Sequence, residues 1–196
     1  MKSSFNVVFF ATSVLLLAFC ASPSASAPAQ STTVASPSPL TCGDPTDAIP
    51  LYIADSPGQT VYYTTSTTDL NILVKLPYDY NFLGIAAHVF PTQELSTVPF
   101  FHVQNDGTID NFYTTSATAR DLALESGYVN ASNTIAGYIY PSQICGSVPF
   151  YGLYSTAATE HFYTINATDY NAKLASGMWT DEGIAGYVLD LDPCAD

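Results

Sequence analysis

The side chains best suited to acid–base or ligand chemistry gather in the last quarter of the chain. Glu160 precedes His161, and Trp179 lies just before the pair Asp181 and Glu182. Two carboxylates on either side of a sugar can hydrolyse a glycosidic bond, whereas carboxylates beside an aromatic ring can hold a sugar by its hydroxyl groups and its apolar face. Asp181 and Glu182 are neighbours, so on a regular strand they would face opposite ways.

Other kinds of catalysis lack their characteristic residues. A serine or cysteine nucleophile requires a histidine that is oriented by a carboxylate, yet His88, His102 and His161 lie in unrelated local contexts, and no Gly-x-Ser-x-Gly turn is present. The sequence also contains no phosphate loop, dinucleotide fingerprint or zinc motif. We therefore expect ordinary, half-buried strand histidines, no catalytic residue, no cofactor and no metal.

The elements that position these residues belong to an internal repeat. Phe162-Tyr163-Thr164 follows Phe112-Tyr113-Thr114 and Tyr62-Tyr63-Thr64 at one constant spacing. An apolar-Pro-aromatic segment precedes each copy, and an Ile-Ala segment that ends at Tyr187, Tyr138 or His88 follows it. Three motifs in one order predict three repeats, at residues 49–97, 98–147 and 148–196.

Each repeat has the residues that typically begin and end one short helix. Ser66, Ser116 and Asn166 can cap the first turn, and Gly127 and Gly177 can close the last one in the left-handed conformation. The pattern predicts a strand, a strand, a helix and a strand in each copy. Because one unit is too small to bury its own apolar face, we expect a mainly β, closed, pseudo-threefold body that is β-trefoil-like, with a short solenoid as the alternative.

The aromatic pair of each repeat suggests a binding surface. Neighbouring residues of a strand face opposite ways, so one ring should enter the core while the other lines the surface or a groove. Repeat three keeps the polar pair Glu160-His161, which is Asp110-Asn111 in repeat two and Thr60-Val61 in repeat one. We expect the best ligand site in repeat three, a partial one in repeat two and none in repeat one. The candidate ligand-binding residues are Glu160, His161, Tyr163, Trp179, Glu182, Asp110 and Tyr113.

Composition restricts the partners. The chain of 196 residues is 47% hydrophobic, and its 17 acidic and 4 basic residues give a net charge of −13. Such a surface cannot neutralise a phosphate backbone and is repelled by anionic lipid, so nucleic acid and membrane surfaces are poor partners. We expect one domain and a monomer.

The sequence of the first part of the chain predicts a leader followed by a linker. Residues 1–29 combine Lys2, an apolar run and small residues, which predicts a signal peptide cleaved between Cys20 and Ala29. A lipoprotein anchored at Cys20 is the alternative. Residues 30–41 are rich in Ser, Thr and Pro and predict a disordered linker before the domain at 42–196. The sequence therefore predicts a secreted, extracellular or wall-associated protein.

Secretion implies a disulfide bond and N-linked glycosylation. Cys42, Cys145 and Cys194 follow the leader, and one pair should form a disulfide. Ring closure favours Cys42–Cys194, whereas the shared Cys-Gly step before an apolar-Pro-aromatic strand favours Cys42–Cys145. Asn130, expected in a loop, and Asn166, which is also the expected helix cap, are glycosylation acceptors.

These motifs resemble a family of secreted fungal and bacterial repeat proteins that is catalogued as a domain of unknown function. The resemblance rests on Glu160 to Thr164 and on Glu182 to Tyr187, and it covers roughly residues 42–190. It implies contact with carbohydrate or cell walls by association, because family members resemble wall-associated modules and some are joined to hydrolytic domains. It also implies the Cys42–Cys145 disulfide. An arginine common in the family is replaced here by Ile53, His102 and Gly152.

Together these features predict a secreted, non-catalytic module that binds carbohydrate or a cell-wall polymer. Two alternatives remain open. In the first, the repeats serve only stability, in a structural or interaction protein of the cell surface. In the second, Glu160 and Glu182 are the carboxylate pair of a glycoside hydrolase.

Overall fold

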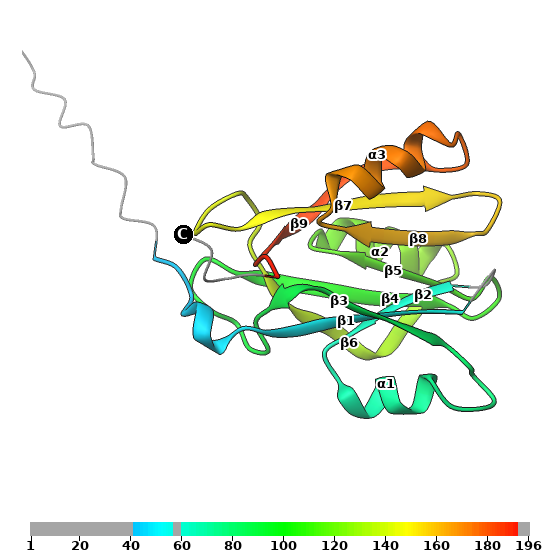
Figure 1. The fold of residues 1–196 in the computed structure, drawn as a ribbon, viewed down its shortest axis with the longest axis horizontal. Coiled ribbons are helices and arrows are strands. Elements are labelled where there is room, and N and C mark those ends of the chain that lie inside the picture. Colours follow the sequence, from blue (N-terminus) through cyan, green and yellow to red (C-terminus); the bar gives the residue numbers. More distant parts are fainter. Residues whose placement is uncertain (1–40, 57–59, 192–196) are drawn as a thin grey trace, which may run out of the picture. The chain divides into compact units, whose positions relative to one another are not determined.

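A computed structural model describes residues 41–56 and 60–191. The predicted signal peptide and most of the linker lie outside these residues, as does Cys194. A short 3₁₀ helix, η1 (Pro45–Asp47), precedes three copies of one order of elements (Figure 1). The elements are β1 (Ile49–Ser56), β2 (Thr60–Thr64), α1 (Thr67–Leu73), β3 (Asn81–Val89), β4 (Val98–Asn105), β5 (Asp110–Thr114), α2 (Ala117–Glu125), β6 (Val129–Ile139), β7 (Val148–Ser155), β8 (Glu160–Thr164), α3 (Ala167–Ala175) and β9 (Thr180–Val188).

Each repeat forms one small antiparallel sheet. The strand orders are β2-β1-β3, β5-β4-β6 and β8-β7-β9, so the first strand of every repeat lies in the middle of its sheet. The second strand pairs antiparallel with it on one edge, and the helix leads to the third strand on the other edge. The predicted sequence of strand, strand, helix and strand is confirmed, and the protein is mainly β.

The helices begin where the capping residues predict. The side chains of Ser66, Ser116 and Asn166 accept hydrogen bonds from backbone N–H groups of the first turn. Gly127 and Gly177 follow α2 and α3 with positive φ angles of 98° and 71°, which residues other than glycine rarely adopt.

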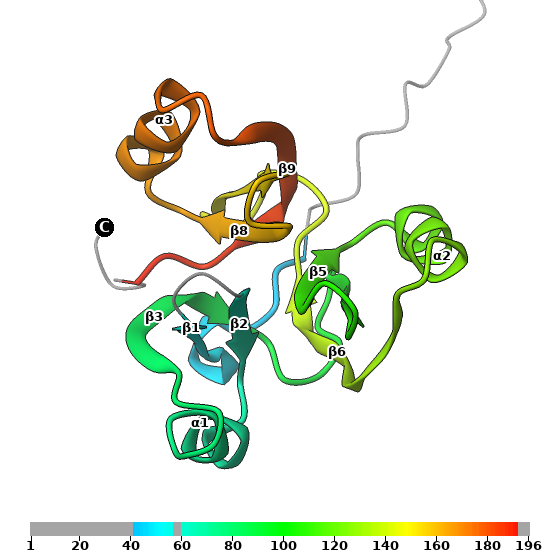
Figure 2. The same cartoon turned by 90° about the vertical axis from the view of Figure 1, so that its right-hand side faces the viewer.

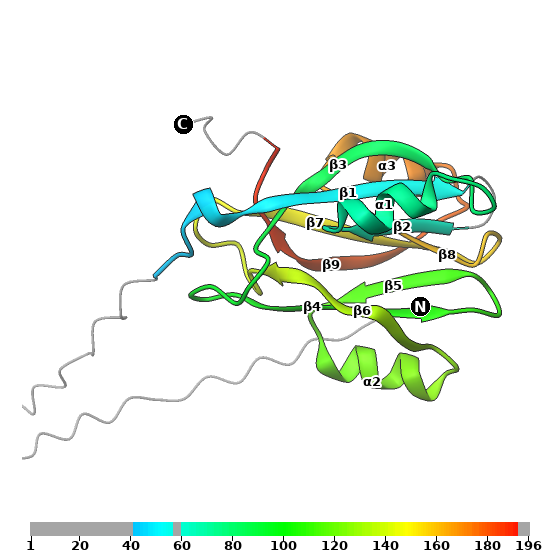
Figure 3. The same cartoon turned by 90° about the horizontal axis from the view of Figure 1, so that it is seen from below.

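The three sheets are grouped around a shared centre, with one helix outermost in each group (Figures 2 and 3). The three inner hairpin strands, β2, β5 and β8, each contact the other two. Within the described residues the three sheets are linked only by single β-bridges and do not merge into a closed barrel. The predicted mainly β body is therefore observed as three small sheets that share a core.

Three tyrosines join the sheets at this centre. Tyr63, Tyr113 and Tyr163 are the middle residues of the repeated aromatic motif, and all are at most 2% exposed. The Tyr63 hydroxyl donates to the Tyr163 carbonyl (2.6 Å) and accepts from its N–H (2.8 Å). The Tyr113 hydroxyl bonds in the same way to the Tyr63 backbone, and the Tyr163 hydroxyl accepts from the Tyr113 N–H. The result is a cyclic set of hydrogen bonds in which each repeat holds another.

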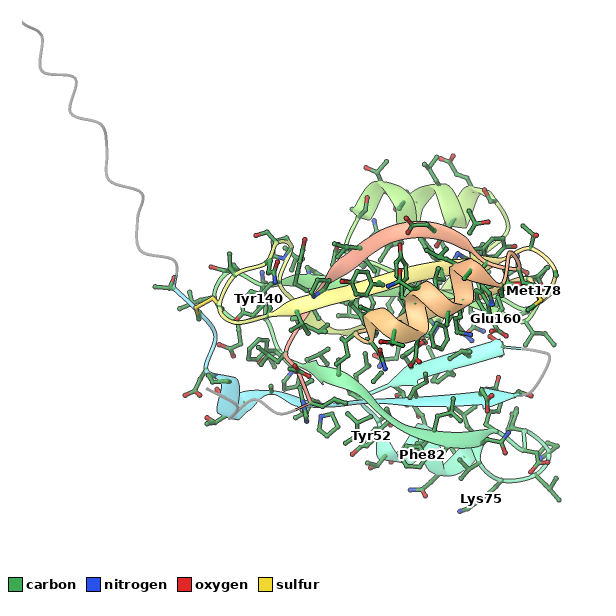
Figure 4. The ribbon with its side chains drawn as sticks, turned by 45° about the horizontal axis from the view of Figure 1, so that its top comes forward. Tyr52, Lys75, Phe82, Tyr140, Glu160 and Met178 are labelled. Carbon is green, nitrogen blue, oxygen red and sulfur yellow. A yellow bond between two sulfur atoms is a disulfide. The ribbon has the colours of Figure 1, made fainter. Side chains whose placement is uncertain are left out.

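A second cyclic set lies where the third strands end. Paired backbone hydrogen bonds join His88 to Leu189, Phe90 to Tyr138 and Tyr140 to Tyr187. Figure 4 shows Tyr140 at this end of the domain and Glu160 at the opposite end. The disulfide Cys42–Cys145 lies at the Tyr140 end, where Cys145 packs beside Phe90, Tyr140 and Leu189. The pairing that the family resemblance implied is confirmed.

Replacing Tyr113 with phenylalanine should lower the free energy of unfolding by about 1–3 kcal/mol, because the Tyr63 N–H and carbonyl would lose their partner in a buried site. Urea denaturation measures this change. Tyr78→Phe is the matched control, since that side chain is 55% exposed. Equal stability of the two variants would contradict a supporting role for the tyrosine hydrogen bonds.

Candidate functional site

A buried ionic network joins repeats two and three. The Nδ1 atom of His161 lies 2.7 Å from Oδ2 of Asp110, and the His161 backbone N–H donates to Oδ1 of the same carboxylate at 2.9 Å. The Tyr128 hydroxyl donates to Oδ2 as well. On the other side of the ring, Nε2 of His161 lies 3.3 Å from Oε2 of Glu182. One imidazole therefore links a buried carboxylate to a half-exposed one.

This environment holds His161 in its charged form. Burial alone would lower the pKa of His161, but its hydrogen bonds to Asp110 and Glu182 and the charges of both outweigh burial and raise the pKa to about 9. For Asp110, burial acts to raise the pKa, and its bonds from His161 and Tyr128 reverse the direction and lower it. Near neutral pH the network is an imidazolium between two carboxylates.

His102 has the opposite character. Burial lowers the pKa of His102 to about 4, although its Nε2 is bonded to the side-chain oxygen of Asn111. The ring stacks on Tyr113 with centroids 4.2 Å apart. His102 is therefore a neutral residue of the core, buried more deeply than the half-buried strand histidines that the sequence predicted, whereas His161 is charged and paired with carboxylates.

A β-bulge directs Glu182 toward His161. In the register of β7 with β9, Gly152 is opposite Gly183 and Leu153 is opposite Asp181, so Glu182 is the extra residue of the bulge. Gly183 has a φ angle of 81°, which suits a bulge of this kind. Asp181 and Glu182 both border the same groove, but the Glu182 carboxylate lies beside His161 whereas Asp181 lies beside Tyr170 of α3.

Glu182 stands on the edge of an open groove between repeats two and three, here called groove B. Its volume is about 580 Å³. The walls include Phe112, Thr115, Tyr154, Thr180, Asp181 and Glu182. Gly152 forms part of the floor, at the position where repeat one has Ile53 and repeat two has the stacked ring of His102. Repeat three thus leaves space over its floor that side chains fill in the other repeats.

Two predicted ligand residues are in the core instead. Tyr113 and Tyr163 border the floor of groove B, but they are 1% and 2% exposed and their hydroxyl groups are bonded to backbone atoms. Neither side chain is free to bind a ligand, so both are removed from the candidate site. The outward ring of the aromatic pair lines the groove, as the alternation of the strand requires, and in repeat two that ring is Phe112.

Two further candidates lie in a different groove. Groove C, between repeats three and one, has a volume of about 330 Å³, and its walls include Asp55, Val61, Glu160, Phe162, Asp169 and Lys173. Trp179 contacts Phe162 and Lys173 there. The structure therefore brings Asp110, His161 and Glu182 together but separates them from Glu160 and Trp179. Glu160 and Glu182 do not face each other across one groove, so the geometry gives no support to a hydrolytic pair.

The remaining groove, groove A, lies between repeats one and two and has a volume of about 580 Å³. Its walls include Tyr62, Asp69, Leu73, Tyr78, Tyr80 and Gln104. Beneath it, the buried amide of Asn111 donates to the Thr60 hydroxyl and to the Val61 carbonyl. Asn111 and Thr60 correspond in the repeat to His161 and Asp110, whose contact joins repeats two and three. Repeat one therefore contributes a groove, although no site was expected there.

Several residues of groove B were missed at the level of sequence. Tyr154 packs on His161 with ring centroids 4.6 Å apart, and Phe112 does so at 4.9 Å. The alternation of β7 could have indicated Tyr154, because it lies on the outer face between inward residues. Gly152 had a visible signal too, as the position where a family arginine is absent.

The glycosylation acceptors stay predictions. Asn130 is exposed, but it lies in β6 and not in a loop. Asn166 is exposed and caps α3 as expected.

No group of three or more His, Cys, Asp or Glu side chains in the described part of the chain is placed to hold a metal ion. No helix in residues 41–56 and 60–191 is long and apolar enough to cross a membrane.

Comparison with known proteins gives one match. The family model described as "Domain of unknown function (DUF5648)" matches residues 51–189, which include all three helices and all nine strands of the repeats except the first two residues of β1. No curated protein and no solved structure matches the chain. The family catalogued as a domain of unknown function, which the repeated motifs suggested, is thereby identified: the chain belongs to the DUF5648 family.

Proposed function

We propose that the protein is a secreted, non-catalytic module that binds carbohydrate in groove B. The observation that carries this proposal is the placement of the Glu182 carboxylate, which His161 holds at the edge of a groove walled by Phe112 and Tyr154. A carboxylate held in place can accept hydrogen bonds from two sugar hydroxyls, and the aromatic rings can cover the apolar face of a pyranose.

Other features of groove B fit a sugar. Thr156 and Thr180 add hydroxyl groups that can both donate and accept hydrogen bonds. The Thr115 hydroxyl donates to the Ala185 carbonyl and can still accept. The open floor at Gly152 adds depth. A groove of about 580 Å³ is within the range of small-molecule sites. The predicted leader and the disulfide support secretion.

We also infer that the three repeats are related by an approximate threefold rotation, in a β-trefoil-like arrangement. The two cyclic sets of hydrogen bonds support it, because each repeat uses corresponding residues to hold the next. An experimental structure in which the repeats superpose about one common axis would support this arrangement, and a translational stack would overturn it.

Replacing Glu182 with glutamine should weaken glycan binding about tenfold, since a charge-assisted acceptor becomes a neutral amide of the same shape. A glycan array and pull-down on chitin and β-glucan first identify the ligand, and calorimetry then measures the affinity of each variant. Glu125→Gln is the matched control, because Glu125 is an exposed residue of α2. Equal weakening in both variants would contradict a binding role for Glu182.

The second candidate is a structural or interaction protein whose repeats serve stability. It is favoured by the core position of Tyr63, Tyr113 and Tyr163, because this part of the repeated motif is buried and joins the sheets. Absence of retention on every glycan, in a chain that unfolds cooperatively, would favour this function over carbohydrate binding.

A further inference from the structure

Repeat three shows how this fold holds a primary ammonium group. The Nζ atom of Lys173 lies 4.1 Å from the ring centroids of both Phe162 and Trp179. Burial lowers the pKa of Lys173, while the carboxylates of Glu160 and Asp169 act in the opposite direction. Two aromatic rings and nearby carboxylates thus surround one ammonium.

Basic side chains lie on aromatic rings elsewhere in the domain as well. The guanidinium of Arg120 lies 4.4 Å from the centroid of Phe101. The domain from residue 42 onward contains only three basic residues, Lys75, Arg120 and Lys173. Two of the three therefore lie on aromatic faces, so this chemistry is a recurrent property of the fold.

Repeat one presents part of the same surroundings without the ammonium, since Thr60 stands where repeat three has Glu160. Tyr62 and Asp69 correspond to Phe162 and Asp169 in the repeat, and Tyr80 precedes Ile85 at the spacing with which Trp179 precedes Ile184. Leu73 stands in the place of Lys173. Groove A is lined by Tyr62, Asp69, Leu73 and Tyr80. The aromatic rings and the carboxylate are thus retained, and the cation that they would surround is missing.

We propose that groove A binds an amino sugar, whose primary ammonium takes the place that Lys173 occupies in repeat three. This site is separate from groove B and does not depend on the function proposed for groove B. Tyr62 and Tyr80 would supply the aromatic faces and Asp69 the carboxylate.

The opposite wall of groove A favours a sugar over the side chain of a lysine peptide. Gln104, Asn105 and Ser132 line that wall with amide and hydroxyl groups, which suit the hydroxyls of a pyranose. Asp106 adds a second carboxylate, and it is exposed. The net charge of −13 attracts a polycation such as an oligomer of glucosamine.

The test uses the full chain and a glucosamine hexamer, with its N-acetylated counterpart as the uncharged comparison. Calorimetry at pH 6 and low salt should detect binding of the glucosamine hexamer. The acetylated hexamer should bind at least tenfold more weakly. Asp69→Asn should weaken the glucosamine hexamer about tenfold. Leu73→Lys should abolish its binding, because the introduced ammonium would fill the site as Lys173 does in groove C.

Matched variants separate this site from general charge effects. Leu122→Lys adds the same charge on α2, at a side chain that is 58% exposed, and should change affinity less than twofold. Asp169→Asn removes the corresponding carboxylate of repeat three, whose site Lys173 already occupies, and should leave affinity unchanged. Thermal melts confirm that each variant is folded.

Four results would overturn the proposal. Three of them are equal binding of the acetylated hexamer, full binding by Leu73→Lys, and tighter binding of a tetralysine peptide than of the glucosamine hexamer. Glu182→Gln distinguishes the two sites: loss of glucosamine binding in that variant would assign the ligand to groove B and overturn the assignment to groove A. If Asp69→Asn and Leu73→Lys are the only variants that impair binding of the glucosamine hexamer, the result supports the amino-sugar site in groove A. This holds whether or not groove B binds a neutral glycan.

Discussion

Replacing His161 with alanine is expected to lower the free energy of unfolding by about 3 kcal/mol near pH 6. The substitution leaves the Asp110 carboxylate, which is 1% exposed, without its cationic partner. Removal of one member of a buried ion pair typically costs about 3–5 kcal/mol. We expect a loss at the lower end of this range, because the Tyr128 hydroxyl and the backbone N–H of residue 161 still donate to Asp110. Urea denaturation measures the loss.

The stabilisation by His161 should depend on pH. The folded-state pKa of His161 is raised from 6.5 to about 9, so its contribution is complete below about pH 6.5 and is lost as the pH rises through about 9. The pKa of Asp110 is lowered from 3.8, so its contribution is complete above that value and is lost as the pH falls further. The difference between the wild type and His161→Ala should be largest between these limits.

The contact between repeats one and two provides a control. There Asn111 and Thr60 occupy the positions of His161 and Asp110 and form a neutral hydrogen bond of 3.1 Å. The double variant Asp110→Thr, His161→Asn should recover most of the stability that His161→Ala loses, and its stability should vary little between pH 6.5 and 9. A variant as unstable as His161→Ala, or one that keeps the pH dependence, would contradict the role assigned to this ion pair.

The elements of the fold were readable from the sequence because local signals agree in three copies. Ser66, Ser116 and Asn166 cap helices by bonds that depend only on neighbouring residues. The strands begin at Ile49, Val98 and Val148, where the predicted repeats begin. Their association was harder to predict, because the hydroxyl groups of Tyr63, Tyr113 and Tyr163 bond to other repeats, and a repeat pattern contains no information about contacts between copies.

The candidate site was only partly predicted, for the same reason. Glu160 and His161 are adjacent in sequence, but they face opposite sides of β8, so one lines groove C and the other joins the network beside groove B. Asp110 was identified as a residue of repeat two, yet its partner is in repeat three. The bulge at Glu182 depends on the register between β7 and β9, which the alternation of a single strand does not specify.

Replacing both Cys42 and Cys145 with serine is expected to lower the free energy of unfolding by about 4–5 kcal/mol. The disulfide closes a loop with a sequence separation of 103, and in the chain-entropy model a loop of this length restricts the unfolded chain by about that amount. Cys145 also packs beside Phe90, Tyr140 and Leu189, so loss of the bond should loosen the end of the domain where the third strands meet. Urea denaturation without reductant measures the change.

Cys194→Ser is the matched control, because it changes one cysteine to serine without removing this bond, and its stability should equal that of the wild type. Reduction of the wild type should reproduce the loss seen in the double variant, since both break the same link. The disulfide connects the segment before β1 to the junction between repeats two and three, so it acts on all three repeats at once. Equal losses in Cys194→Ser and in the double variant would mean that another pairing stabilises the domain, and ring closure through Cys194 would then be the better account.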